Sequence, residues 1–290
     1  MAAFSPWITP LNQSCWQEVS PTGWITLYEG IPAHIDCLGP LLYELFQEHW
    51  AEIQVGCVAE GGVLEAAFTS PPALCVLYDG YLTVATETWH LHLCLEEHRG
   101  GPYGRTPLEL RRKRLVSRAA LYRRLNPQRQ PRQWGIQFWN GAEESLLQIF
   151  LPSPFLGPGE DYLPESKANY QKLSLYERLR AIYVEGKERI PYEDNPLKRP
   201  YLAVCRSSRC YPSRNYQPVV EALQSALQEA NLDIRVITSG CLEVCQEGPV
   251  VFYSGDRTWY KRVTPPVARQ IVQEHLLKNC PLKAHLFPGD

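Results

Sequence analysis

Residues 201–210 read YLAVCRSSRC and residues 235–249 read RVITSGCLEVCQEGP, and these two stretches decide the fold of the last third of the chain. In each, a short apolar stretch typical of a strand is followed closely by a pair of cysteines. Residues 218–230 carry apolar side chains at helical spacing. The order strand, helix, strand predicts two adjacent parallel strands, whose carboxyl ends meet at one edge of a sheet. The side chains gathered there are Cys205, Cys210, Cys241 and Cys245.

The spacing of these cysteines favours an iron–sulfur cluster over other thiol chemistry. Four thiolates at one edge can hold two irons bridged by sulfides. Ser239 and Gly240 are small and let the backbone approach the sulfides. Zinc sites favour C-x2-C pairs or mixtures of cysteine and histidine, and dithiol redox catalysis requires C-x-x-C. Here the pairs are separated by four and by three residues.

The same region resembles a known family. C-x4-C, then C-x3-C-x-x-G-P ending at Pro249, then W-Y-x-x-V-T-P over 259–265, is similar to the thioredoxin-like [2Fe–2S] ferredoxins. The resemblance covers roughly residues 200–277. It implies a thioredoxin-like α/β domain with the four cysteines as cluster ligands. It also implies one-electron transfer to a redox partner protein.

Composition sets the broad class of the protein. The chain has 290 residues, of which 44% are hydrophobic, and a formal net charge of −2, which fits a soluble protein of about two domains. No apolar run is long enough to span a membrane. Ten cysteines without a secretory leader at the start favour metal or redox chemistry in a cytoplasmic protein over a disulfide framework.

Four segments are expected along the chain. Residues 1–24 are rich in proline and predict an irregular lead-in. Residues 25–190 predict an α+β domain with an antiparallel sheet. Residues 191–199 form a charged linker, and residues 200–290 form the α/β ferredoxin domain.

Within the α+β domain, periodicity predicts helices over 39–53 and 172–185. Alternation predicts strands over 63–69, 73–78, 81–95, 133–139 and 145–151. Asp79-Gly80 and Asn140-Gly141 are dipeptides typical of two-residue hairpin turns.

A basic segment spans residues 105–132, with ten Lys or Arg against one acidic residue. Its pattern predicts a helix over 107–125, on which Arg111, Arg114 and Arg118 share a face. Such a face suits docking of an acidic partner surface or binding of carboxylates. A nucleic-acid motif does not accompany it, so nucleic acid is an unfavoured partner.

The stretch TWHLHLC over 88–94 places His90 and His92 on one face of a strand, and His98 follows nearby. These imidazoles could bind a metal, a heme iron or a flat ligand. The alternative is a set of hydrogen-bonded histidines on a half-exposed sheet.

The run from Ala73 to Leu156 resembles the heme-utilisation proteins of the ChuX, HutX and HemS type. The resemblance rests on TWHLHL, the basic segment, and WGIQFWNGAEESLLQIFLP over 134–152. It implies a heme or related tetrapyrrole in the N-terminal domain, without fixing a ligand residue.

The sequence thus predicts a [2Fe–2S] electron-transfer protein fused to a domain that binds heme or a related tetrapyrrole. The alternative is a docking or assembly module of a larger redox complex, without a pigment. A stand-alone enzyme is the third choice, because no catalytic motif is found. Whether the chain forms a homodimer stays open.

Overall fold

The computed structural model describes residues 4–8, 14–59, 62–102, 104–158, 161–207, 215–240, 242 and 247–287. The chain divides into two compact units. Unit 1 comprises residues 1–97 and 108–197, and unit 2 comprises residues 98–107 and 198–290. Each unit has both helices and antiparallel strand pairs, so the protein is a mixed α and β protein.

Unit 1 is built on a seven-stranded sheet with the order β1-β2-β8-β9-β10-β3-β4. All of its pairs are antiparallel. Its strands are β1 (Cys15–Val19), β2 (Ile25–Ile31), β3 (Gln54–Ala59), β4 (Gly62–Ala67), β8 (Val116–Leu125), β9 (Pro131–Asn140) and β10 (Ser145–Phe150).

A second, three-stranded antiparallel sheet in unit 1 has the order β5-β6-β7. Its strands are β5 (Leu74–Tyr78), β6 (Tyr81–Ala85) and β7 (His90–Cys94). Asp79 and Gly80 join β5 to β6 with φ angles of 42° and 83°, which confirms the predicted hairpin turn. The helices of unit 1 are α1 (Ile35–Gln47), α2 (Leu108–Arg114) and α3 (Ser174–Tyr183), with short 3-10 turns at Trp50–Glu52, Glu165–Lys167, Tyr170–Leu173 and Pro196–Lys198.

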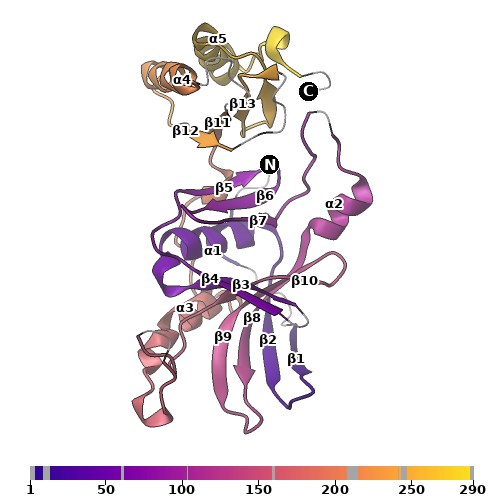
Figure 1. Cartoon of the computed structure of the whole chain (residues 1–290), viewed down its shortest axis with the longest axis vertical. Coiled ribbons are helices and arrows are strands. Elements are labelled where there is room, and N and C mark those ends of the chain that lie inside the picture. Colours follow the sequence, from indigo (N-terminus) through magenta and orange to yellow (C-terminus); the bar gives the residue numbers. More distant parts are fainter. Residues whose placement is uncertain are drawn as a thin grey trace. The chain divides into compact units, whose positions relative to one another are not determined.

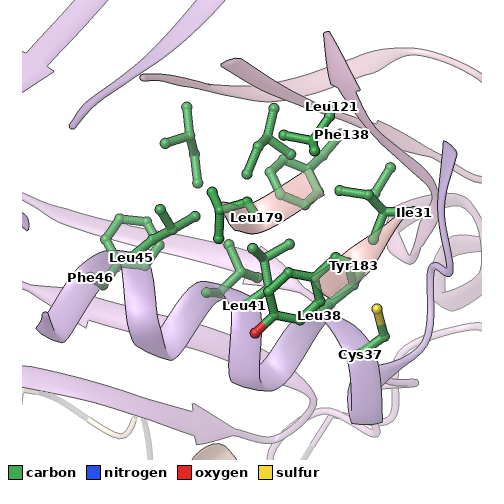
Figure 2. Close-up of a cluster of buried hydrophobic side chains, with 14 of the residues drawn as sticks. Ile31, Cys37, Leu38, Leu41, Leu45, Phe46, Leu121, Phe138, Leu179 and Tyr183 are labelled. Carbon is green, nitrogen blue, oxygen red and sulfur yellow. The ribbon is translucent and has the colours of Figure 1, made fainter. Parts of the chain in front are cut away.

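Helix α1 lies between the two sheets of unit 1 and forms the centre of its core (Figure 1). Its buried stripe consists of Cys37, Leu38, Leu41, Leu42, Leu45 and Phe46. Figure 2 shows this stripe facing Leu121 and Phe138 of the large sheet and Leu179 and Tyr183 of α3. Burial of these apolar surfaces is the main stabilising contribution in unit 1.

The helix predicted over 107–125 is wrong. Only Leu108–Arg114 is helical, and Val116–Leu125 forms strand β8 between β2 and β9. Both faces of β8 are buried, Leu121 in the main core and Tyr122 in an aromatic cluster on the opposite face. Because both faces are buried, polar and apolar residues do not alternate along this strand. The spacing of its apolar residues then resembles the pattern of a helix.

The irregular lead-in predicted for residues 1–24 is also wrong in part, because Cys15–Val19 forms strand β1. Among the described residues this edge strand pairs with β2 alone, and most of its side chains are exposed. An exposed edge strand has no buried face to impose alternation, so its sequence carries little strand signal.

Unit 2 contains a four-stranded sheet with the order β12-β11-β13-β14. Strands β11 (Tyr201–Cys205) and β12 (Arg235–Ser239) are parallel, whereas β13 (Val251–Tyr253) and β14 (Thr258–Tyr260) are antiparallel to their neighbours. Helix α4 (Gln217–Glu229) connects β11 to β12 and contacts α5 (Pro265–Gln270), which continues as a π-helix over Ile271–Leu276. A 3-10 turn at Lys283–His285 follows. The element order expected from the sequence is confirmed here.

In the part of the chain that the structure describes, no helix is both long and apolar enough to cross a membrane.

Candidate functional site

The carboxyl ends of β11 and β12 lie at the same edge of the unit 2 sheet. Their register runs from Tyr201 opposite Arg235 to Cys205 opposite Ser239. The ladder continues one residue further, because the Arg206 backbone N–H donates to the Ser239 carbonyl over 3.0 Å. On its other side, the Cys205 N–H donates to the Val250 carbonyl over 3.2 Å. Cys205 and Ser239, the last residues of the two strands, therefore lie next to each other at this edge.

Of the four predicted ligands, the structure describes Cys205, which is fully buried at the end of β11. The other three lie outside the described residues. At Gly240, which precedes the third cysteine, a Cβ atom would have no heavy atom of the described residues within 4 Å. A buried thiol at the strand edge and room beside the Gly240 backbone fit a cluster held by thiolates. Within the described residues no group of three or more His, Cys, Asp or Glu side chains is arranged to hold a metal.

The segment after the second loop is fixed by hydrogen bonds to the end of β14. The Arg262 N–H donates to the Glu247 carbonyl over 2.8 Å, and the Val263 N–H donates to the Pro249 carbonyl over 2.9 Å. The Arg262 guanidinium also contacts the Glu247 carboxylate at 3.1 Å. The Gly248-Pro249 peptide bond is cis. These bonds hold the chain that follows the cysteine loop against the sheet.

Sequence reasoning missed a buried polar network in unit 2. His275 is 3% exposed, and its two ring nitrogens contact the Tyr260 hydroxyl at 2.7 Å and the Asp256 carboxylate at 2.8 Å. Burial alone would raise the pKa of Asp256, but hydrogen bonds from His275 and Thr258 outweigh it and lower this pKa. The three residues come from a turn, a strand and the π-helix, so no local sequence pattern connects them.

The histidine pair lies on β7 of unit 1, and both side chains are exposed. The rings of His90 and His92 are 5.2 Å apart and inclined by 64°. His92 Nδ1 contacts the Thr83 hydroxyl on β6 at 3.0 Å. Desolvation and, to a smaller extent, the neighbouring His90 lower the pKa of His92, which keeps the imidazole neutral at neutral pH.

The third predicted histidine is not part of this pair. His98 is buried and belongs to the segment 98–107, which clusters with unit 2. The structure brings together His90 and His92 within one sheet and assigns His98 to the other unit.

The predicted basic helical face of Arg111, Arg114 and Arg118 does not exist. The first two lie on α2, and Arg118 lies on β8. Much of the positive charge is compensated by acidic side chains from other parts of unit 1. The observed ion pairs are Arg111–Glu97 at 3.3 Å, Lys113–Glu144 at 3.1 Å, Arg118–Glu143 at 2.7 Å and Arg132–Glu165 at 3.8 Å.

Known proteins match the two parts of the chain separately. A putative 2Fe-2S ferredoxin of Priestia megaterium is 38% identical over 90 residues, which cover 30% of this chain and 68% of that protein. A 2Fe-2S ferredoxin of Clostridium pasteurianum is 30% identical over 86 residues, which cover 26% of this chain and 83% of that protein.

Two solved structures are similar as well. The thioredoxin-like [2Fe-2S] ferredoxin of Aquifex aeolicus is 29% identical and covers 30% of this chain and 94% of its own, with a TM-score of 0.27. ChuX is 16% identical and covers 48% of this chain and 71% of its own, with a TM-score of 0.31. The resemblance to the 2Fe-2S ferredoxins inferred from the sequence is thus confirmed by two relatives at 38% and 30% identity.

Residues 15–185, more than half of the chain, match a family of unknown function, DUF7676. The chain therefore belongs to the DUF7676 family and, over about 30% of its length, to the 2Fe-2S ferredoxins.

Proposed function

We propose that the protein is a one-electron carrier with a [2Fe–2S] cluster held by Cys205, Cys210, Cys241 and Cys245. The observation that carries this proposal is the shared edge of β11 and β12, where Cys205 stands opposite Ser239. The identity with two 2Fe-2S ferredoxins supports the same ligand chemistry. When bound, the cluster would supply a site that accepts and releases one electron.

The residues of this chain would set the environment of the cluster. The fully buried Cys205 thiol would provide a ligand away from water, and burial is one of the factors that set the reduction potential of a cluster. None of the described residues crowds the Gly240 backbone, which would let N–H groups approach the sulfides. The bonds from Arg262 and Val263 would limit movement of the segment that follows the last ligand.

The test is chemical analysis and spectroscopy of the full chain. We expect about two irons and two acid-labile sulfides per chain. Dithionite should bleach the visible absorption and give an electron paramagnetic resonance signal of one unpaired electron. Stoichiometric zinc without sulfide would contradict the proposal.

A second function is favoured by the histidine pair. We propose that unit 1 binds heme or a related tetrapyrrole through His92. Its Nδ1 is engaged by the Thr83 hydroxyl, which orients the ring and leaves Nε2 as the ligand atom. The lowered pKa favours the neutral imidazole that iron requires. Because His90 and His92 project from the same face of one strand, both could face the same ligand, and His92 would hold its iron.

Titration of the full chain with hemin tests this second proposal. We expect a shifted Soret band that is lost in His92→Ala and weakened in His90→Ala. His34→Ala, which removes another exposed histidine of unit 1, is the matched control. A Soret shift that persists in His92→Ala would contradict the assignment. The iron–sulfur analysis is independent of this result.

The alternative of a docking or assembly module gains no support from the described residues. Its predicted basic helical face is absent, and the ion pairs of Arg111 and Arg118 reduce the positive charge available to a partner.

A further inference from the structure

The face of the seven-stranded sheet that points away from α1 and α3 carries an unusual set of polar and aromatic side chains. Alternation along each strand separates this outer face from the core. On β8, Leu121 points to the core, and Tyr122 and Arg124 point outward. The outer face therefore collects residues that the main core does not use.

Aromatic packing makes one part of this face rigid. The Trp16 and Tyr28 rings stack with centroids 5.0 Å apart, and Trp139 packs against both. The Arg118 guanidinium lies 4.3 Å from the Trp139 ring centroid and 5.0 Å from that of Trp16. Such cation–π contacts stabilise a fixed arrangement of the rings.

Beside this cluster the face contains a cavity of ≈ 260 Å³. All of the elements around it belong to unit 1. The cavity is lined by Glu18, Val19, Ser20, Thr26, Tyr28, Tyr122, Arg124, Gln133 and Gln148. Its size suits a ligand of about ten non-hydrogen atoms, smaller than most drug-like molecules.

Tyr122 is the most informative residue of the cavity lining. Tyr122 is 3% exposed, and its hydroxyl has no hydrogen-bond partner among the described residues. Burial raises the pKa of Tyr122, so the hydroxyl keeps its proton and can donate it in a hydrogen bond. A buried hydroxyl without a partner is a free-energy cost to the folded state, because it has lost its hydrogen bonds to water and gained none. A ligand with an acceptor atom would remove this cost.

The backbone makes this placement of Tyr122 feasible. Gly135 lies opposite Tyr122 in the β8–β9 register. A Cβ atom at Gly135 would approach the Tyr122 hydroxyl oxygen to 2.6 Å, so the ring lies directly over the glycine. The absence of a side chain at Gly135 makes room for the Tyr122 hydroxyl on this face of the sheet.

The other polar groups of the cavity are also rich in unused donors. No hydrogen bond or ion pair joins the side chains of Arg124, Gln133 or Gln148 to any other part of the chain that the structure describes, and Arg124 packs over the Trp24 ring at 5.1 Å. The acidic side chain, Glu18, is exposed and already accepts from the Tyr28 hydroxyl at 3.4 Å. Unused hydrogen-bond donors of the cavity therefore outnumber its unused acceptors. One of these donors, the Arg124 guanidinium, carries a permanent positive charge.

We propose that this cavity binds a small organic carboxylate, whose oxygens accept from the Tyr122 hydroxyl and the Arg124 guanidinium. The planar guanidinium matches a carboxylate with two parallel hydrogen bonds. The Gln133 and Gln148 amides can contact a polar substituent of the ligand, and the Tyr28 ring offers an apolar wall. This site uses none of the four cysteines and neither His90 nor His92, so it goes beyond the proposed function.

Binding of three small aromatic probes tests the proposal on the full-length protein. Benzoate and benzamide are planar, have the same number of non-hydrogen atoms and differ in charge, and benzylamine is a cation of similar size. Their binding is measured by ligand-observed NMR and calorimetry. We expect benzoate to bind with about millimolar affinity. Benzamide should bind at least about ten-fold more weakly, because it lacks the charge that pairs with Arg124. Benzylamine should not bind. Succinate and inorganic phosphate are added to separate organic carboxylates from anions in general.

The variants separate a ligand site from a structural role. Tyr122→Phe and Arg124→Gln should each weaken benzoate binding at least about ten-fold. Arg123→Gln changes the neighbouring residue on the opposite face of β8 and is the matched control, with unchanged binding. The melting temperature of ligand-free Tyr122→Phe should equal or exceed that of the wild type, because the unpartnered hydroxyl is removed.

Three results would overturn the proposal. The first is that neither benzoate nor succinate binds the wild type at a ligand concentration of about 10 mM. Even a fragment with low ligand efficiency would show detectable binding at this concentration. The second is that phosphate competes as well as benzoate, which would leave a general anion site. The third is equal benzoate affinity in the wild type and in Tyr122→Phe, which folds without any new strain.

Discussion

The Arg206 N–H donates to the Ser239 carbonyl over 3.0 Å, one residue beyond the pairing of Cys205 with Ser239. This bond extends the parallel pairing of β11 and β12 to the start of the first cysteine loop. Backbone hydrogen bonds on both sides thus fix the position of Cys205. Its neighbour Arg206 bonds to Ser239, and Cys205 itself bonds to Val250. A ligand held by the sheet itself needs little rearrangement to accept a metal.

Replacement of Cys205 by serine should therefore remove most of the cluster. A serine hydroxyl is a much poorer ligand than a thiolate at neutral pH, because it stays protonated. We expect the iron content of Cys205→Ser to fall from about two to below about one per chain. Cys280→Ser, which changes an exposed cysteine, should keep both iron and absorption. Equal iron in the two variants would show that Cys205 is not a ligand.

The His275 network predicts a pH-dependent contribution to the stability of unit 2. The folded pKa of Asp256 is lowered, so its contribution is present above the unfolded value of about 3.9 and is lost as the pH falls through the lower folded value. Asp256→Asn should lower the free energy of unfolding by about 1 kcal/mol at pH 7, since the carboxylate is partly exposed. The difference from the wild type should shrink below about pH 3.9.

Hydrogen exchange of the backbone amides of residues 251–276 in urea would measure the stability of unit 2 separately from that of unit 1. Tyr260→Phe removes the hydroxyl on the other side of His275 and leaves the carboxylate in place. It should therefore keep the acid dependence that Asp256→Asn loses. The same acid dependence in Asp256→Asn and in the wild type would contradict the assignment.

Local sequence patterns were sufficient to predict an element where a single physical feature determines its structure. The Asp79-Gly80 turn follows from the tolerance of both residues for positive φ, and α1 follows from its apolar stripe. The Asn140-Gly141 turn is a partial failure. Four residues join β9 to β10, and Glu143 takes the positive φ of 60°. The Asn140 side chain accepts from two backbone N–H groups of this loop, a role that the dipeptide pattern does not reveal.

The remaining differences come from tertiary structure. Whether residues 116–125 form a helix or a strand depends on the presence of partners on both sides, β2 and β9, and a local window does not contain them. The cysteine site stays a prediction, and it was inferred from the sequence because each pair follows closely on its own strand. The His275 network and the Tyr122 cavity could not, because their residues come from distant segments that meet only in the folded chain.

Glu44 on α1 predicts a second pH dependence, of opposite sign. Its carboxylate is buried beside the Arg178 guanidinium and the Tyr183 hydroxyl. Desolvation raises the pKa of Glu44 despite the attraction of Arg178. Its contribution to stability is therefore fully present below the unfolded pKa of about 4.3 and is lost as the pH rises through the higher folded value.

Glu44→Gln should weaken the dependence of the stability of unit 1 on pH, because the amide does not titrate. The measurement is the free energy of urea unfolding of unit 1 at several pH values above about 4.3. Glu177→Gln changes an exposed residue on α3, and its free energy of unfolding should vary with pH as steeply as that of the wild type. A slope in Glu44→Gln equal to that of the wild type would assign the dependence to another group.

The close approach of Gly135 to Tyr122 predicts the cost of a single methyl group. A Cβ atom at Gly135 would lie 2.5 Å from the Ile149 carbonyl oxygen and 2.6 Å from the Tyr122 hydroxyl, and the carbonyl belongs to a paired strand that cannot move freely. Gly135→Ala should therefore lower the free energy of unfolding by about 1–3 kcal/mol. Gly62→Ala, where a Cβ meets no atom within 4 Å, should stay within about 0.5 kcal/mol of the wild type. Equal stability of the two variants would mean that the Tyr122 ring does not lie over Gly135.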